Sequence, residues 1–177
     1  MRHCDQAILL CVSANRGGDN RMRNTSIALF DSISRPIIAI SNEYVFGCQL
    51  QSHSHRRLQL LYGSEGVIHI TTRQGTWVVP PQRAVLIPAM VPHEVRFLGV
   101  TTQSLYIEPV EPLLTLPTCK LIEVSPLMRI LLREAVELPL EYDEHGRDGM
   151  LIRLLIHEIG RATALPPHVP MPRDERL

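Results

Sequence analysis

The sequence lacks a net charge, paired cysteines and any long apolar run, and each absence argues against a class of protein. The 177 residues include 18 basic and 18 acidic side chains, so the overall charge favours neither nucleic acid nor an acidic membrane surface. The four cysteines form no C-x-x-C pair, which argues against a zinc knuckle or a disulfide scaffold and favours a reducing cytoplasm. No apolar run approaches the roughly 18 residues that a membrane span needs. We therefore expect a cytoplasmic protein without a membrane segment.

Several enzyme signatures are also missing. The sequence contains no serine-hydrolase elbow, no P-loop and no dinucleotide-binding fingerprint. Nothing in it reads as a helix-turn-helix, and the balanced charge offers no phosphate-binding surface. We therefore expect that this chain alone does not bind DNA specifically.

The first part of the chain predicts a flexible extension followed by a β-rich domain. Residues 1–26 contain Gly-Gly, several arginines and little apolar content, and we expect them to be a flexible N-terminal extension. From residue 27 to 124, short apolar runs recur about every 8–12 residues between Gly, Pro, Asn and Ser, which is typical of an antiparallel barrel or sandwich. The expected strands are 27–30, 36–41, 44–50, 58–63, 67–72, 76–80, 84–88, 93–98, 104–108 and 119–124.

The remainder predicts two helices and a tail. Ser125 can cap a helix that runs to about Leu138, with Pro126 at its first position. Asp148 can cap a second helix that ends near Ala164. The apolar faces of this 125–165 appendage exceed what one side of a barrel needs, so we expect a homodimer through these helices. Residues 166–177 read as a Pro-rich linker or tail.

Three histidines are the candidates for chemistry. His53 and His55 are two residues apart in a segment that reads as strand, so both imidazoles are expected on one face, and His93 follows in a second strand-like segment. Together they predict either a metal site or the polar floor of a ligand pocket. Arg57 is two residues after His55, so on a strand the two side chains would point to the same face. Arg57 either lies on a solvated rim or reaches an anionic ligand. The candidate pocket residues are Gln59, Arg57, Tyr62, Trp77 and Met90; of these, Tyr62 and Trp77 are also explained as core residues.

The spacing around the histidines resembles the two cupin motifs, G-x5-H-x-H-x3/4-E-x6-G and P-x-G-x2-H-x3-N. The first block runs from Gly47 to Gly66 and the second from Pro88 to Phe97. The resemblance implies that His53, His55 and His93 are metal ligands. Gln59 stands where the family has Glu, Met90 where it has Gly, and Phe97 where it has Asn. Three neutral imidazoles can hold Zn²⁺, Ni²⁺ or Fe²⁺, but the anionic ligand is lost. A metal site and a metal-free pocket both remain open.

A wider resemblance covers nearly the whole chain. The stretches HSHRRLQLLYGSEGVIHITTRQGTWVVPPQRAVLIPAMVPHEV, LYIEP and EVSPLMRILLREAVELPLEYDEHGRDGMLIRLLIHEI look like the N-terminal sensory half of AraC-type bacterial transcription regulators. This resemblance implies a cupin-like antiparallel β-barrel (a jelly roll, or double-stranded β-helix) with two C-terminal α-helices. In the family, a C-terminal domain with two helix-turn-helix motifs binds DNA. We expect this chain to lack that half, as a shortened gene product or a stand-alone relative.

The resemblance implies a function without a chemical step. A small-molecule effector, with or without a metal, binds near His53, His55 and His93 and biases the arrangement of the two helices. The prediction is therefore a sensory and dimerisation domain and not an enzyme. The alternative is a stand-alone metal-dependent cupin enzyme, either an isomerase or an oxygenase.

Overall fold

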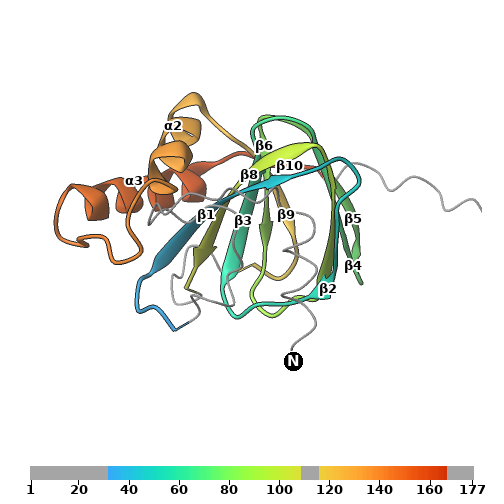
Figure 1. Ribbon diagram of the computed structural model, residues 1–177, viewed down its shortest axis with the longest axis horizontal. Coiled ribbons are helices and arrows are strands. Elements are labelled where there is room, and N and C mark those ends of the chain that lie inside the picture. The colour runs from blue at the N-terminus through green and yellow to red at the C-terminus, as the bar shows by residue number, and fades with distance from the viewer. Residues whose placement is uncertain (1–31, 109–115, 167–177) are drawn as a thin grey trace, which may run out of the picture.

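The computed structural model describes residues 32–108 and 116–166, and within them the chain forms two antiparallel sheets that face each other (Figure 1). The larger sheet has the order β1 (Ile37–Tyr44), β8 (Val100–Ile107), β3 (Leu58–Gly63), β6 (Arg83–Ile87), β9 (Lys120–Glu123) and β10 (Ala164–Leu165). The smaller sheet has the order β2 (Gln49–His53), β7 (His93–Leu98), β4 (Val67–Thr72) and β5 (Gly75–Val79). The predicted fold class, a cupin-like antiparallel barrel, is confirmed.

The larger sheet separates two apolar cores, and β3 shows why. Every residue of β3 is buried, because one face packs on helices and the other faces the smaller sheet. Leu58, Leu60 and Tyr62 belong to the core under the helices, whereas Leu61 belongs to the core inside the barrel. The alternation of side chains along a strand therefore divides this apolar run between two environments.

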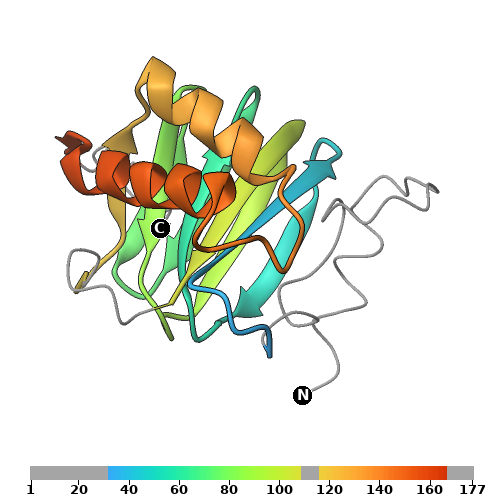
Figure 2. The same cartoon turned by 90° about the vertical axis from the view of Figure 1, so that its left-hand side faces the viewer.

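The helices α2 (Pro126–Ala135) and α3 (Arg147–Arg161) cover the outer face of the larger sheet (Figure 2). The predicted start of α2 is confirmed, since the Ser125 side chain accepts a hydrogen bond from the Met128 backbone N–H and Pro126 begins the helix. The predicted cap of α3 is wrong. Gly146 precedes the helix without a side-chain cap, and Asp148 lies in the first turn, where its charge favours the positive end of the helix dipole.

One local prediction is corrected by the strand pairing. The run 44–50 is not one strand, because β1 ends at Tyr44 and β2 begins at Gln49. The turn at Ser64–Gly66 joins β3 of the larger sheet to β4 of the smaller one, and Gly66 adopts a positive φ of 71° there. The predicted extension (1–26), the strand at 27–30 and nearly all of the tail fall outside the described residues. In the described part of the chain, no helix is long and apolar enough to cross a bilayer.

Candidate metal and ligand site

The three histidines come together where the two sheets meet. His53 is the last residue of β2 and pairs directly with His93, the first residue of β7. His55 lies between β2 and β3, where the chain passes from the smaller sheet to the larger one. The ring centroid of His93 is 4.3 Å from that of His53 and 5.1 Å from that of His55. The expected convergence is present, but it arises from a sheet-to-sheet crossing and not from two positions on one strand.

A backbone carbonyl fixes the orientation of each imidazole. The Nδ1-to-oxygen distances are 2.8 Å for His53 and the Gln51 carbonyl, 2.7 Å for His55 and the Arg57 carbonyl, and 2.9 Å for His93 and the Val91 carbonyl. Because a carbonyl oxygen can only accept, each Nδ1 carries the proton and donates it. Each neutral ring therefore keeps its lone pair on Nε2. Histidines that bind metals are held by the same kind of second hydrogen bond.

The ring nitrogens converge closely enough to share a metal ion. One ring nitrogen from each histidine lies within 4.8 Å of the others. Nε2 of His93 is buried and has no hydrogen-bond partner, which leaves a polar atom unsatisfied in the absence of a ligand. A divalent transition metal would satisfy this atom, so the three residues fit such an ion.

Burial keeps the imidazoles of His53 and His93 neutral near pH 7. Burial, reinforced by the neighbouring His53, lowers the pKa of His93 from 6.5 to about 3. Burial also lowers the pKa of His53. Only neutral imidazole binds a metal, so this environment prepares the rings for that role.

Gln59 lies beside the histidines, as the sequence predicts for a pocket residue. It is buried on β3, and its Oε1 is 3.1 Å from Nε2 of His55. Its amide Nε2 donates to the Tyr106 hydroxyl at 3.1 Å and faces the Ser104 hydroxyl at 3.4 Å. This arrangement places the Gln59 oxygen opposite Nε2 of His55. The contact is favourable if Nε2 also carries a proton, if a cation lies between the two atoms, or if the amide is turned over. The three imidazoles and the Gln59 amide together form a set of uncharged potential metal ligands.

Two residues of this site were missed from the sequence. Ser104 and Tyr106 lie two apart on β8, and Tyr106 pairs directly with Gln59 across the sheet. Burial raises the pKa of Tyr106, which keeps its hydroxyl protonated. The alternation of polar and apolar residues in SLYIE was the available signal, since it places both hydroxyls on one face of the strand.

Arg57 does not reach the mouth of the barrel, and that expectation is corrected. Its side chain is fully buried, and its guanidinium forms an ion pair with Glu108 at 2.7 Å. It also donates to the carbonyls of Ile33 and Arg35, both at 2.8 Å. The guanidinium is therefore occupied by protein groups.

The other three predicted pocket residues lie in three different environments. Tyr62 packs beneath the helices on the far side of the larger sheet, so its assignment to the pocket is wrong. Trp77 belongs to the core inside the barrel and pairs with Ile70 on β4. The side chain of Met90 is 66% exposed, but its backbone N–H donates to the His55 carbonyl at 2.8 Å. Met90 has a φ of 63°, a left-handed conformation that glycine adopts without strain.

Comparison with known proteins gives one relative of known class. No protein-family model matches the chain. It is 32% identical over 130 residues to the HTH-type transcriptional regulator NimR of Escherichia coli K12, an alignment that covers 71% of this chain and 46% of NimR. The chain thus spans about half the length of this relative.

Solved structures with a similar fold include an RmlC-like cupin from Shewanella frigidimarina, with 21% identity and a TM-score of 0.39 over 43% of this chain and 69% of that one. They also include oxalate decarboxylase from Bacillus subtilis, with 16% identity and a TM-score of 0.39 over 44% of this chain and 22% of that one. Since an enzyme is among them, the prediction that the chain is not an enzyme is corrected: the barrel fold does not exclude catalysis.

Proposed function

We propose that this chain is the effector-sensing part of an AraC-type transcription regulator, with a divalent metal held by His53, His55 and His93. The observation that carries the proposal is the convergence of three carbonyl-oriented imidazoles, with the buried Nε2 of His93 awaiting a partner. The likeness to a transcriptional regulator over 71% of the chain supports the regulatory role. Zn²⁺, Ni²⁺ and Fe²⁺ all suit imidazole ligands and would supply open positions for a small molecule.

The residues around the histidines set what the site can bind. Gln59, held by Tyr106 and Ser104, presents its carbonyl oxygen without adding negative charge. A dication bound to these four neutral groups keeps its full charge, which favours an anionic effector such as a carboxylate.

The helices support the proposed dimer. Leu127 and Ile130 of α2 and Met150 and Leu154 of α3 are between 42% and 57% exposed, although all four are large and apolar. A second copy of the chain would bury them. DNA binding is assigned to a C-terminal helix-turn-helix domain of the regulator. Sedimentation at tens of micromolar that showed only monomer would contradict the dimer.

A second candidate function uses the same site. The open positions that three neutral histidines leave on a metal also suit a metal-dependent isomerase or oxygenase. The two functions differ in what the histidines affect in the cell: gene expression in one case and turnover of a substrate in the other.

The first test measures metal in protein purified without a histidine tag. We expect one transition-metal ion per chain in the wild type, and none in His53→Ala or His93→Ala. His69→Ala is the matched control, because His69 lies on the same barrel between the inward-facing Ile68 and Ile70, outside the histidine cluster. A metal-free wild type, after reconstitution with Zn²⁺, Ni²⁺ and Fe²⁺, would refute the metal site.

The second test separates regulator from enzyme. The chromosomal gene is replaced by the His93→Ala form, and the transcripts are compared with those of a deletion strain. If the protein is a sensor, both strains should differ from the wild type in transcripts from the same promoters. Unchanged transcripts, together with accumulation of a metabolite in both strains, would instead favour the enzyme.

A further inference from the structure

The ion pair of Arg57 and Glu108, in which the arginine is fully buried, adjoins the histidine site. The carbonyl of Arg57 accepts the Nδ1 hydrogen of His55, so the backbone of Arg57 sets the direction of that imidazole. The side chain of the same residue holds the carbonyls of Ile33 and Arg35, which belong to the segment before β1. Arg57 therefore connects His55, a proposed metal ligand, to the segment before β1.

Arg35 continues the connection to the helices. Its Nε donates to the carbonyl of Tyr142 at 3.1 Å, and its guanidinium carbon lies 5.7 Å from the centre of the Tyr142 ring. A further nitrogen lies 3.4 Å from a carboxylate oxygen of Glu144. The carbonyl of Glu144 in turn accepts a hydrogen bond from Arg153 of α3 at 2.8 Å. The contacts thus lead from the histidines to the loop between α2 and α3.

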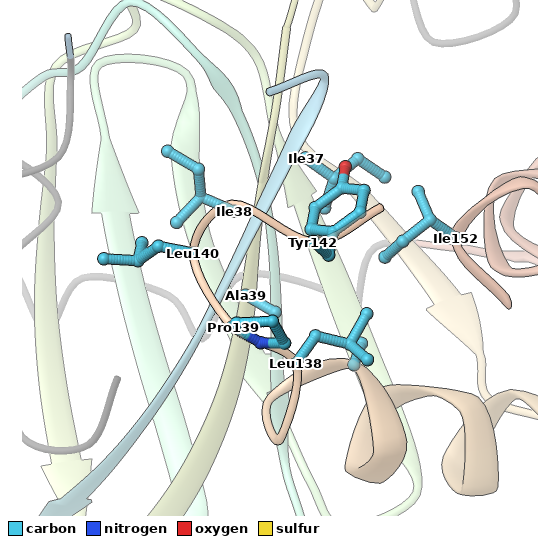
Figure 3. A pocket seen from close by; sticks show the side chains of 9 residues that line it. Ile37, Ile38, Ala39, Leu138, Pro139, Leu140, Tyr142 and Ile152 are labelled. Atoms are coloured by element: carbon cyan, nitrogen blue, oxygen red, sulfur yellow. The ribbon is translucent and has the colours of Figure 1, made fainter. Parts of the chain in front are cut away.

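That loop is packed against the barrel next to β1. Leu138, Leu140 and Tyr142 of the loop line a small pocket with Ile37 and Ile38 of β1 (Figure 3). The Tyr142 side chain is only 4% exposed, and the loop is therefore a packed element rather than a free connection. A change in its packing on β1 would alter how α2 and α3 sit on the sheet.

We propose that Arg57 and Arg35 couple occupancy of the histidine site to the loop that joins α2 and α3. The inference rests on the proposed function, since it says how a sensory site communicates with the helices. A metal bound by His55 restrains its imidazole, and the Nδ1 hydrogen bond transmits this restraint to the Arg57 backbone. The buried guanidinium cannot lose its carboxylate or its carbonyls cheaply, so a shift at Arg57 is passed to the segment that carries Arg35.

The test is hydrogen exchange of the full chain with and without saturating Zn²⁺, followed in peptides that cover residues 138–146. In the wild type we expect Zn²⁺ to slow exchange in this loop by about fivefold or more, the lower end of typical coupling between sites. Arg35→Met should still bind one Zn²⁺ per chain but lose the response of the loop. Glu108→Gln, which removes the charge that holds Arg57, should reduce the response.

Arg83→Met is the matched control. Arg83 pairs with Glu123 at 3.2 Å, and its side chain is 30% exposed, close to the 25% of Arg35. It lies on β6, however, and is not among the contacts that lead from the histidines to the loop. Its variant should keep the full response. Zn²⁺ binding without any change in the wild-type loop would overturn this inference alone, as would an undiminished response in Arg35→Met. If no metal binds, the proposed metal site fails as well, and the Zn²⁺ stoichiometry distinguishes the two failures.

Discussion

Acid should destabilise the metal-free protein through His93. Its pKa is lowered to about 3 in the folded state, mainly by burial, against 6.5 for an exposed histidine. Between these values the unfolded chain binds a proton that the folded chain does not. Stability therefore rises with pH in this range: the contribution is complete above 6.5 and is progressively lost as the pH falls toward 3.

The size of the effect follows from the two pKa values. At pH 5 the unfolded histidine is almost entirely protonated and the folded one is almost entirely neutral. Linkage then gives a loss of about 2 kcal/mol in the free energy of unfolding between pH 7 and pH 5. For a urea dependence of about 2 kcal/mol per molar, the midpoint of unfolding falls by about 1 M. His53, whose pKa is also lowered by burial, acts in the same direction.

Urea unfolding in the presence of EDTA, followed by circular dichroism at both pH values, measures this directly. His93→Asn should lose most of the pH dependence, because the titrating group is gone whatever the stability of the variant. His69→Asn, outside the site, should keep it. If His93→Asn lost as much stability between pH 7 and pH 5 as the wild type, the reasoning about His93 would be refuted.

Three substitutions test local features of the fold by the same unfolding measurement. Gly66→Ala should cost several times more than Gly47→Ala, because both glycines have a positive φ but only at Gly66 would a Cβ clash with the backbone oxygens of Gly99 and Leu98; equal costs would contradict this. Ser125→Ala should cost about 1 kcal/mol by removing the cap of α2, and a neutral effect would show that the cap is dispensable. Met90→Gly should stabilise the protein by up to about 1 kcal/mol through relief of its positive φ, and a loss of stability would argue that the exposed side chain packs.

The periodic runs were sufficient to predict an antiparallel barrel or sandwich, and the motif resemblance then favoured the cupin-like barrel. The runs at 58–63, 67–72 and 93–98 coincide with β3, β4 and β7, because each is bounded by turn residues or proline. The N-cap of α2 was readable because Ser-Pro is a local signal. The start of α3 was not readable, because Gly146 precedes the helix without a side-chain cap and so gives no local capping signal.

The histidine cluster was predicted from spacing, but for an incomplete reason. Counting in steps of two assumes an unbroken strand, and the strand ends at His53. The pairing of β2 with β7 is already irregular between Leu50 and His53, so alternation does not extend across this region. The rings converge because the chain changes sheets there, which is a tertiary feature.

The same break explains the opposite outcome for Arg57. Equal parity with His55 suggested a common direction, yet the residues between His53 and Leu58 are not strand. Their backbone is shaped by the hydrogen bond from His55 Nδ1 to the Arg57 carbonyl, while the Arg57 side chain is drawn to Glu108 and to the carbonyls of Ile33 and Arg35. Glu108 is 51 residues away from Arg57 and carries no local signal of its partner. In the sequence, a buried arginine that positions a metal-binding histidine therefore looks the same as one that contacts a small molecule itself. The distinction comes from which carboxylate and which carbonyls the fold places around it, and this is why Arg57 belongs to the connection between the site and the helices rather than to the pocket.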